Sequence, residues 1–132
     1  MNLDELFKEI EQDLTISFEN LHEKTYKIPN YHSKYLKLYF EQKRILNKCN
    51  EELGKLYKNK YYYYTEQYEY KLDTTKEINF HIYSDEEYSK ANLKTENQKL
   101  LVDCLERTLK RVQFLSKDVS NIQEQLKYMQ GV

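Results

Sequence analysis

Residues 101–129 read LVDCLERTLKRVQFLSKDVSNIQEQLKYM, and mostly apolar side chains recur along them at alternating intervals of four and three residues. This spacing is the heptad repeat of a helix that packs one side against another helix. The repeat continues without interruption, so it predicts one long helix resembling a coiled coil. The repeating residues are Leu101, Leu105, Thr108, Val112, Leu115, Val119, Ile122, Leu126 and Met129.

The apolar side of this stretch is widest in its first half, where Val102, Cys104 and Leu109 flank the heptad positions. A surface of that width suits contact with more than one helix. We expect the first half to pack within the subunit and the second half to join subunits into a homo-oligomer; contact with the same chain alone is the alternative. The expected interface residues are Leu105, Val112, Leu115, Val119, Ile122, Leu126 and Met129.

Composition narrows the fold class. Two glycines and one proline among 132 residues leave few of the turns that a strand-rich protein needs. The sequence therefore predicts an all-α protein with a single domain over residues 1–132. Within it, we expect acidic N-terminal helices and a long basic helix over 1–70, a connector and short helix over 71–94, and the heptad helix over 95–131.

Charge is strongly segregated along the chain. Residues 1–23 carry seven acids and one base, whereas residues 24–60 carry ten bases and three acids. A basic block of this kind calls for a partner or for an acidic neighbour within the chain. The acidic N-terminal block is one such neighbour, and both possibilities remain open.

Several signals place the helices of the first half. A short helix is expected over residues 2–13, and Ser17 is expected to cap a second one that ends near Lys27. Pro29 disfavours helix in the residue before it, so the long helix is expected to start there and to continue to about Tyr70. The apolar positions of the first helix are Leu3, Leu6, Phe7 and Ile10.

The long helix has an apolar face and, almost opposite, a basic stripe. Single-strand-binding proteins combine a cationic track with aromatic side chains on which bases stack. Tyr62 projects between Lys55 and Lys58, whereas Tyr57, Tyr61, Tyr64 and Tyr68 extend the apolar face. We therefore predict base stacking for Tyr62 and packing for the other four tyrosines. The basic stripe consists of Lys34, Lys37, Arg44, Lys48, Lys55 and Lys58.

The region before the heptad helix carries mixed signals. Residues 78–82 alternate like a strand, but one strand has no partner in this chain, so we expect a connector or a strand that pairs with another subunit. The sequence from Ser84 to Glu87 predicts a capping box for a short helix. Thr95 predicts a further cap in front of the heptad helix.

No group of residues is arranged for catalysis. Cys49 and Cys104 fall at expected buried positions, and none of the three histidines has a cysteine or carboxylate at metal-ligand spacing. The glycines are too few for a phosphate-binding loop. We expect no enzyme, catalytic residue, metal or cofactor. The apolar runs are too short to span a membrane, and the start of the chain lacks a signal peptide, so a cytoplasmic location is expected.

Three stretches resemble the UvsY family of phage recombination mediators. They are Ser33-Lys34-Tyr35-Leu36, Lys58-Asn59-Lys60-Tyr61-Tyr62-Tyr63-Tyr64, and Asp103-Cys104-Leu105 at the start of a heptad helix that ends at Gly131. The resemblance covers roughly residues 14–131. It departs from the T-even-like pattern after the tyrosines, where Thr65-Glu66-Gln67-Tyr68 replaces a glycine-rich loop, so the helix is expected to run further here.

The resemblance implies a function. Such proteins bind single-stranded DNA and the phage recombinase, and they help the recombinase displace the single-strand-binding protein in the cytoplasm of the infected bacterium. They assemble through the C-terminal region into a homo-oligomeric ring of hexamer or heptamer size, with the heptamer favoured. The family's DNA-contacting basic pair falls on Lys58 and Lys60.

A second function stays open alongside this one. The chain could be a structural coiled-coil adaptor whose charged blocks bind only protein partners. The basic stripe would then meet the acidic residues 1–23 of a neighbouring subunit. A titration with oligo-dT distinguishes the two functions, because only the first requires affinity for single strands.

Overall fold

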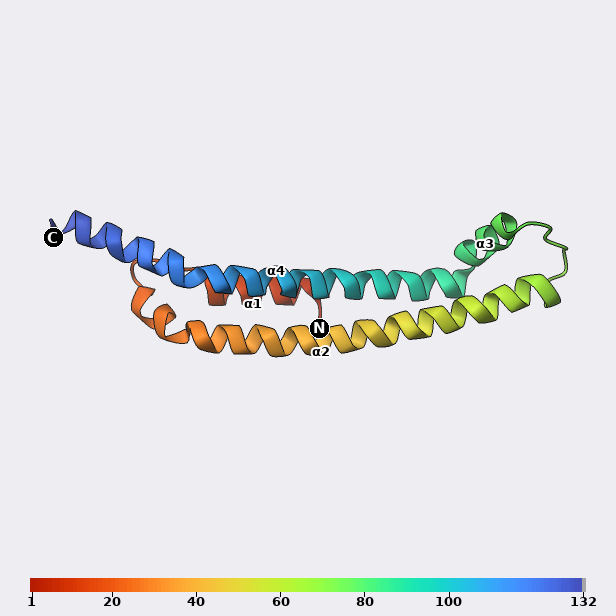
Figure 1. Cartoon of the computed structure of the whole chain (residues 1–132), viewed down its shortest axis with the longest axis horizontal. Coiled ribbons are helices and arrows are strands. Elements are labelled where there is room, and N and C mark those ends of the chain that lie inside the picture. The colour runs from red at the N-terminus through yellow and green to blue at the C-terminus, as the bar shows by residue number, and fades with distance from the viewer. Residues whose placement is uncertain (132) are drawn as a thin grey trace. The chain divides into compact units, whose positions relative to one another are not determined.

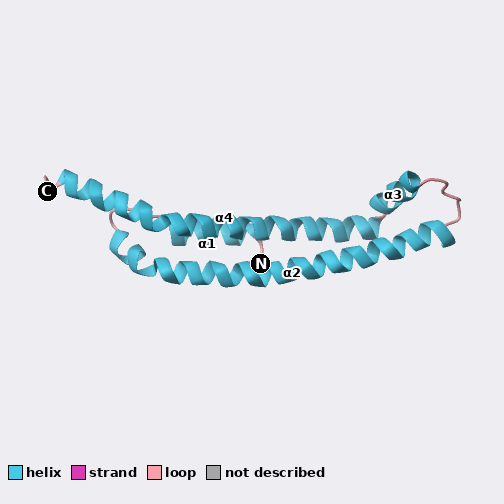
Figure 2. Cartoon of the chain, viewed as in Figure 1, coloured by secondary structure: helices cyan, strands magenta, loops and turns pink. Residues whose placement is uncertain are grey.

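The structure is a computed structural model that describes residues 1–131. These form α1 (Leu3–Leu14), α2 (Leu21–Tyr62), the π-helix η1 (Tyr63–Gln67), α3 (Thr75–Ser84) and α4 (Glu86–Met129) (Figure 1). Figure 2 shows helices joined by loops, with no strand in this part of the chain. The predicted all-α class is confirmed.

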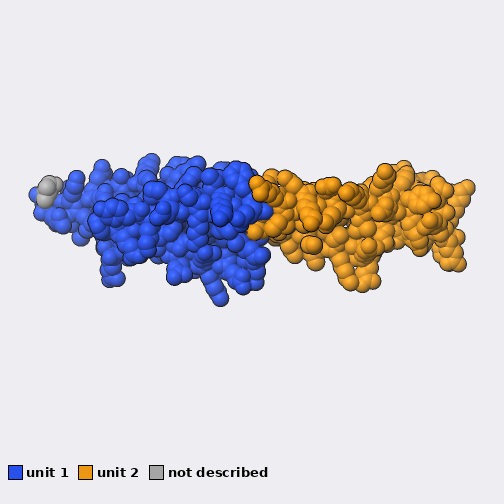
Figure 3. All heavy atoms as spheres, turned by 90° about the horizontal axis from the view of Figure 1, so that it is seen from below, with its two compact units in different colours: residues 1–41, 101–132 blue, residues 42–100 orange. Residues whose placement is uncertain are grey.

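The described residues fall into two compact units, which Figure 3 colours separately. Unit 1 contains residues 1–41 and 101–131, and unit 2 contains residues 42–100. Both long helices contribute one segment to each unit, since α2 passes residue 41 and α4 passes residue 100 without a break.

Unit 1 is built around an aliphatic core that α1 shares with segments of α2 and α4. Asn2 caps α1 by accepting a hydrogen bond from the backbone N–H of Asp4 at 2.7 Å. Leu6 of α1 and Leu105 of α4 are fully buried, as is Tyr35 of α2. The cluster of buried residues consists of Leu6, Ile10, Leu14, Tyr31, Tyr35, Leu101, Leu105, Val112 and Leu115.

Unit 2 has a smaller core that is rich in tyrosine. Ile78 and Ile82 of α3 and Tyr88 of α4 form its buried centre. Tyr57 of α2 packs against this centre, and its hydroxyl donates a hydrogen bond to the side chain of Asn79. The other partly buried residues around the centre are Leu53, Leu56, Tyr64 and Leu72.

The expected break at Pro29 is wrong. α2 begins at Leu21 and includes the proline, and Ser17 is not its cap. Instead, the Ser17 N–H donates to the Asn20 side chain at 2.8 Å. Burial of Tyr31 beyond the proline, with Ile28 packed on the same core, outweighs the local preference. A proline inside a helix bends it, and Figure 1 shows α2 curving in its first turns.

The connector or strand expected at residues 78–82 is also wrong, because these residues lie within α3. The Thr74 side chain caps α3 by accepting from the Glu77 N–H at 3.2 Å. Ile78 and Ile82 are four residues apart and both buried, a spacing that fits a helix as well as an alternating strand. Phe80, between them, is 68% exposed.

Two predicted caps are displaced or absent. In place of the capping box predicted from Ser84, a single side-chain cap lies one residue later, where Asp85 accepts from the Tyr88 N–H at 3.1 Å. Thr95 does not begin a helix, because α4 already started at Glu86. The Thr95 hydroxyl donates to the Ala91 carbonyl oxygen at 2.9 Å, which satisfies it inside an unbroken helix.

The end of the long helix lies close to its predicted place. α2 ends at Tyr62, and η1 continues the helical path to Gln67, three residues before the predicted Tyr70. The Thr65 hydroxyl donates to the Tyr61 carbonyl oxygen at 2.8 Å within this passage from α-helix to π-helix. The tyrosine run therefore stays helical, as the missing glycine-rich loop suggests.

Within unit 1, most of the heptad positions are buried by the chain itself. Leu105, Val112, Leu115 and Val119 are no more than 4% exposed. Ile122 and Leu126 are half-buried, and Met129 is 76% exposed. Internal packing therefore uses the repeat as far as Val119 and leaves its last positions uncovered.

Candidate nucleic-acid interface

The basic stripe has unpaired cations in unit 2. Arg44, Lys48 and Lys58 form no ion pair with the described residues. Lys55 pairs with Glu51 at 3.2 Å, but both side chains are about 70% exposed, and such surface pairs contribute little. These bases lie on one side of α2 at intervals of three, four or seven residues, so they can meet a phosphate chain together.

Tyr62 lies at the end of this basic side and is 58% exposed. Within the described chain its ring pairs with no other aromatic ring. Tyr61, by contrast, lies 6.2 Å from Tyr57, and Tyr63 lies 4.9 Å from Tyr64 between ring centroids. Tyr62 is thus the member of the tyrosine run whose ring face is open.

The tyrosines expected to pack do so to different degrees. Tyr57 and Tyr64 contact the core of unit 2, while Tyr61 is 38% exposed. The Tyr64 ring stacks on His81 at 5.6 Å, and Tyr68 lies 5.4 Å from the same histidine. These ring contacts join η1 and the segment after it to α3. Packing therefore accounts for most of the tyrosines that were expected to pack.

Lys60 lies in an ion-pair cluster with Asp85, Glu87 and Tyr64, which we call the Lys60 cluster. Its Nζ lies 3.2 Å from Asp85 Oδ2 and 2.9 Å from Glu87 Oε2. The Tyr64 hydroxyl donates to the same Asp85 oxygen at 2.8 Å. The lysine and aspartate side chains are 19% and 12% exposed, so both charges are largely withdrawn from solvent. Of the two members of the resemblance's basic pair, only Lys58 is unpaired.

The electrostatics of the Lys60 cluster favour its charged form. The hydrogen bond from Lys60 to Glu87, aided by Asp85, raises the pKa of the lysine against the opposing effect of burial. Burial pushes the pKa of Asp85 upward, but hydrogen bonds from the Tyr88 N–H, Tyr64 and Lys60 outweigh it and lower that pKa. Burial and the Asp85 carboxylate raise the pKa of Tyr64 to about 12.

A matching arrangement in unit 1 consists of Lys34, Glu9, Asp13 and Tyr35, which we call the Lys34 cluster. Lys34 Nζ lies 2.6 Å from a carboxylate oxygen of each acid. The Tyr35 hydroxyl donates to Asp13 at 2.8 Å. Lys37, the next basic position along α2, has no ion pair within residues 1–131.

The acids that hold these two lysines were not singled out by the sequence. The segregation of charge signalled an acidic neighbour in residues 1–23, and Glu9 and Asp13 confirm it for Lys34. For Lys60, the acids stand at the start of α4 and also fit the role of a helix cap. Their second role, the pairing with Lys60, depends on how α4 packs against α2.

The described part of the chain holds no group of three potential metal ligands. Cys49 and Cys104 are free thiols, and burial raises the pKa of the Cys104 thiol. None of the helices described is long and apolar enough to cross a membrane.

The sequence profile of the family described as "Recombination, repair and ssDNA binding protein UvsY" matches residues 9–132. The chain belongs to the UvsY family. Membership places it in recombination and repair. By sequence, no curated protein matches the chain.

Solved UvsY structures share the fold over nearly the whole chain. Three crystal structures of the recombination mediator protein UvsY of bacteriophage T4 superpose with TM-scores of 0.87, 0.85 and 0.79. They are 18%, 16% and 15% identical in sequence, and the matches cover 98%, 98% and 95% of this chain and 99%, 98% and 98% of those chains. The helical order is therefore that of UvsY, although most side chains differ.

Proposed function

We propose that this chain is a non-enzymatic recombination mediator that binds single-stranded DNA through Arg44, Lys48, Lys58 and Tyr62 of unit 2. It promotes loading of a phage recombinase in place of the single-strand-binding protein. The observation that carries the proposal is the open ring of Tyr62 on the same side of α2 as unpaired cations. Family membership supports it independently.

The physical basis is a combination of charge and stacking. Phosphate contacts release counterions, which makes the affinity depend on salt, and each base stacked on an aromatic ring contributes roughly 1–3 kcal/mol. Lys55 adds a further phosphate contact once its ion pair with Glu51 breaks, and the unpaired Lys37 offers another cation in unit 1. Lys34 and Lys60 can contact phosphate only after their ion pairs with the neighbouring carboxylates break.

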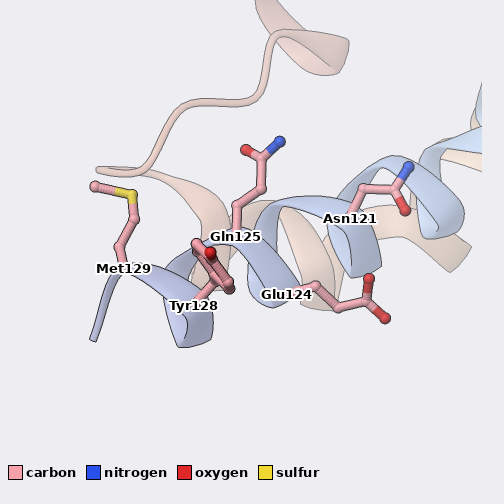
Figure 4. A pocket seen from close by; sticks show the side chains of 5 residues that line it. All are labelled: Asn121, Glu124, Gln125, Tyr128 and Met129. Atoms are coloured by element: carbon pink, nitrogen blue, oxygen red, sulfur yellow. The ribbon is translucent and has the colours of Figure 1, made fainter. Parts of the chain in front are cut away.

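We also propose that the chain assembles into a homo-oligomeric ring, of hexamer or heptamer size with the heptamer favoured. Support comes from the uncovered end of the heptad repeat, at Ile122, Leu126 and Met129. Figure 4 shows the side chains that line a shallow hollow in the same turns of α4, namely Asn121, Glu124, Gln125, Tyr128 and Met129, of which only Met129 belongs to the repeat. A ring presents several basic tracks at once, so weak contacts add through effective concentration.

The proposed recombinase and single-strand-binding protein partners are supported by the family's description and by the T4 relative, which is a recombination mediator. The chain would act by binding alone, in the cytoplasm of an infected bacterium, with the recombinase capturing the strand that the ring holds. No catalytic residue, metal or cofactor enters this mechanism.

Tyr62 provides the test of the proposal. Tyr62→Ala should weaken binding of labelled oligo-dT in a fluorescence anisotropy titration by roughly fivefold or more, the lower end expected for loss of one stacked base. Tyr26→Ala is the matched control, since Tyr26 is 73% exposed and belongs to unit 1, so it is not one of the residues of the proposed site. Equal affinities for the wild type and Tyr62→Ala would remove this tyrosine from the site.

Assembly is tested separately. Leu126→Asp combined with Met129→Asp should give a smaller species by light scattering, because charged residues would replace the uncovered apolar positions. Leu115 is unsuitable for this test, since it is only 2% exposed within the chain. An unchanged mass would show that the last heptads are not the interface.

The adaptor function makes the opposite prediction for nucleic acid. If the wild type showed no affinity for oligo-dT at low salt, a protein-only role for the charged surfaces would replace the proposal.

A further inference from the structure

The outer side of α3 carries two aromatic side chains that the core of unit 2 does not bury. Phe80 is 68% exposed and Tyr83 is 58% exposed. Lys76 lies one turn before Phe80 and two turns before Tyr83, so the three side chains share one side of the helix, which we call the α3 face. The buried Ile78 and Ile82 lie on the opposite side. α3 therefore presents an aromatic and basic face to solvent.

A row of rings joins the α3 face to α2. The Tyr83 ring lies 6.4 Å from that of Tyr57, and the Tyr57 ring lies 6.2 Å from that of Tyr61, measured between centroids. Asn79 helps to hold α3 in this place, because its side chain accepts a hydrogen bond from the Tyr57 hydroxyl. The row therefore continues from α3 onto the surface of α2.

On α2, the row of rings reaches the proposed single-strand site. At 3.6 residues per turn, Tyr61 lies between Tyr57 and Lys58 around the helix. Lys58 in turn lies between Tyr61 and Tyr62. The row that starts on α3 therefore ends beside the residues proposed to hold the strand, and all of them belong to unit 2.

We propose that the α3 face is a second stacking platform for single-stranded nucleic acid, on which bases stack once the strand held at Lys58 and Tyr62 has crossed Tyr61. The inference rests on the proposed function and extends its site from α2 to α3. The platform accepts strands of any sequence, because every base has a face that stacks on an aromatic ring.

The charges around the α3 face fit a phosphate chain. Lys76 forms no ion pair with residues 1–131, and its flexible stem lets the ammonium group reach the phosphate of a base that stacks on Phe80. Glu77 is the one acid of α3, and its carboxylate accepts from the Asp73 N–H at 3.1 Å at the start of the helix. The face has rings and a cation but no aliphatic side chain, whereas grooves that bind protein helices are apolar.

Substitutions at Phe80 test the stacking. In an anisotropy titration of the full-length protein with labelled oligo-dT, Phe80→Ala should bind roughly fivefold or more weakly, the lower end expected for one lost stacked base. Phe80→Tyr should bind like the wild type because it keeps a ring, whereas Phe80→Leu should resemble Phe80→Ala. Phe114→Ala is the matched control, since Phe114 is 63% exposed and belongs to unit 1.

Substitution of Lys76 tests the phosphate contact. Lys76→Gln should make the dependence of affinity on salt shallower by about 0.7 in the logarithmic slope, the value for one phosphate of a single strand. Lys90→Gln is the matched control. Lys90 is two residues from Tyr88, whose ring contacts Tyr83, and therefore points away from the α3 face. Equal slopes in the two variants would contradict a strand path over α3.

The outcomes separate the platform from the proposed function. Unchanged affinity in Phe80→Ala, with a loss in Tyr62→Ala, would overturn the platform and leave the proposed function intact. Wild-type affinity in Phe80→Leu would also overturn it, since stacking needs a ring. A loss of affinity accompanied by a smaller mass in light scattering would assign the α3 face to contact between subunits instead. If the wild type failed to bind oligo-dT, the proposed function itself would fail. Circular dichroism would confirm that each variant keeps its helical content.

Discussion

The Lys34 cluster in unit 1 and the Lys60 cluster in unit 2 have the same parts in different settings. In each, one lysine of α2 contacts two carboxylates, and a nearby tyrosine hydroxyl donates to one of them. The Lys34 acids lie on α1, which is also held by a large aliphatic core. The Lys60 acids lie at the start of α4, beside a small core rich in tyrosine.

The difference shows that one motif can contribute to different degrees in two packing environments. In unit 1, burial of Leu6, Leu105 and their neighbours fixes α1, so the ion pairs add little to what already holds the helix. In unit 2, the cluster joins α2 to the first turn of α4 beside a small core, so its ion pairs are a larger part of what holds these elements together.

The largest expected effect tests the contrast between the two cores. Leu105→Ala should lower the free energy of unfolding by about 2–5 kcal/mol, because its side chain is fully buried in a densely packed cluster. Ile82→Ala in unit 2 should cost about 2 kcal/mol, since partly buried neighbours can move into the space. Urea denaturation measures both.

The exposed Leu93 is the control for these two variants, and Leu93→Ala should change stability by less than about 0.5 kcal/mol. A larger loss from Ile82→Ala than from Leu105→Ala would contradict the ranking of the two cores.

The next largest expected effect is the pH dependence of the folding stability that Tyr64 contributes in the Lys60 cluster. Tyr64 has a pKa of about 12 in the folded chain, above its ordinary value of 10.0, so folding favours the protonated hydroxyl. The stability from this group is complete below pH 10 and is lost as the pH rises from 10 to 12. Tyr64→Phe should cost about 1 kcal/mol at pH 8 through the lost hydrogen bond.

Tyr64→Phe should also lose less stability than the wild type between pH 10 and pH 12. Urea denaturation at pH 8, 10 and 11.5 gives the comparison, and taking the difference between the two proteins removes the titration of the lysines. Parallel losses in both proteins would exclude Tyr64 as a source of the alkaline sensitivity.

The smallest effect is a gain in stability. Gly54 lies inside α2, and a Cβ added there would meet nothing within 4 Å. Gly54→Ala should therefore raise the free energy of unfolding by about 0.5–1 kcal/mol, because alanine loses less backbone entropy in a helix. Thermal unfolding followed by circular dichroism measures it, and a loss of stability would show that the position is occupied in the assembled protein.

Much of the fold could be predicted from periodicity. The heptad repeat from Leu101 and the two-faced helix over the basic stripe are long patterns, and both are confirmed as helix. Besides the predicted caps, the errors fell at Pro29 and in residues 78–82, where burial of Tyr31 or of Ile78 and Ile82 decides the conformation. Such burial depends on residues far away in the sequence.

Only part of the candidate site could be predicted from the sequence. Helical spacing was sufficient to single out Tyr62, because its direction depends on its own helix alone. Which lysines are unpaired depends on acids from other helices, as Asp85 and Glu87 show for Lys60. Spacing alone could therefore locate the stripe but could not separate its open positions from its neutralised neighbours.

The central claim is that unpaired cations of unit 2 contact single-stranded DNA. The most direct test is the salt dependence of oligo-dT affinity for Arg44→Ala combined with Lys58→Ala. The matched control is Lys110→Ala with Lys117→Ala, which removes equal charge from unit 1 at residues without ion pairs in the described chain. We predict a logarithmic slope shallower by about 1.4 for the unit 2 variant and an unchanged slope for the control. Equal slopes in the two double variants would contradict the claim.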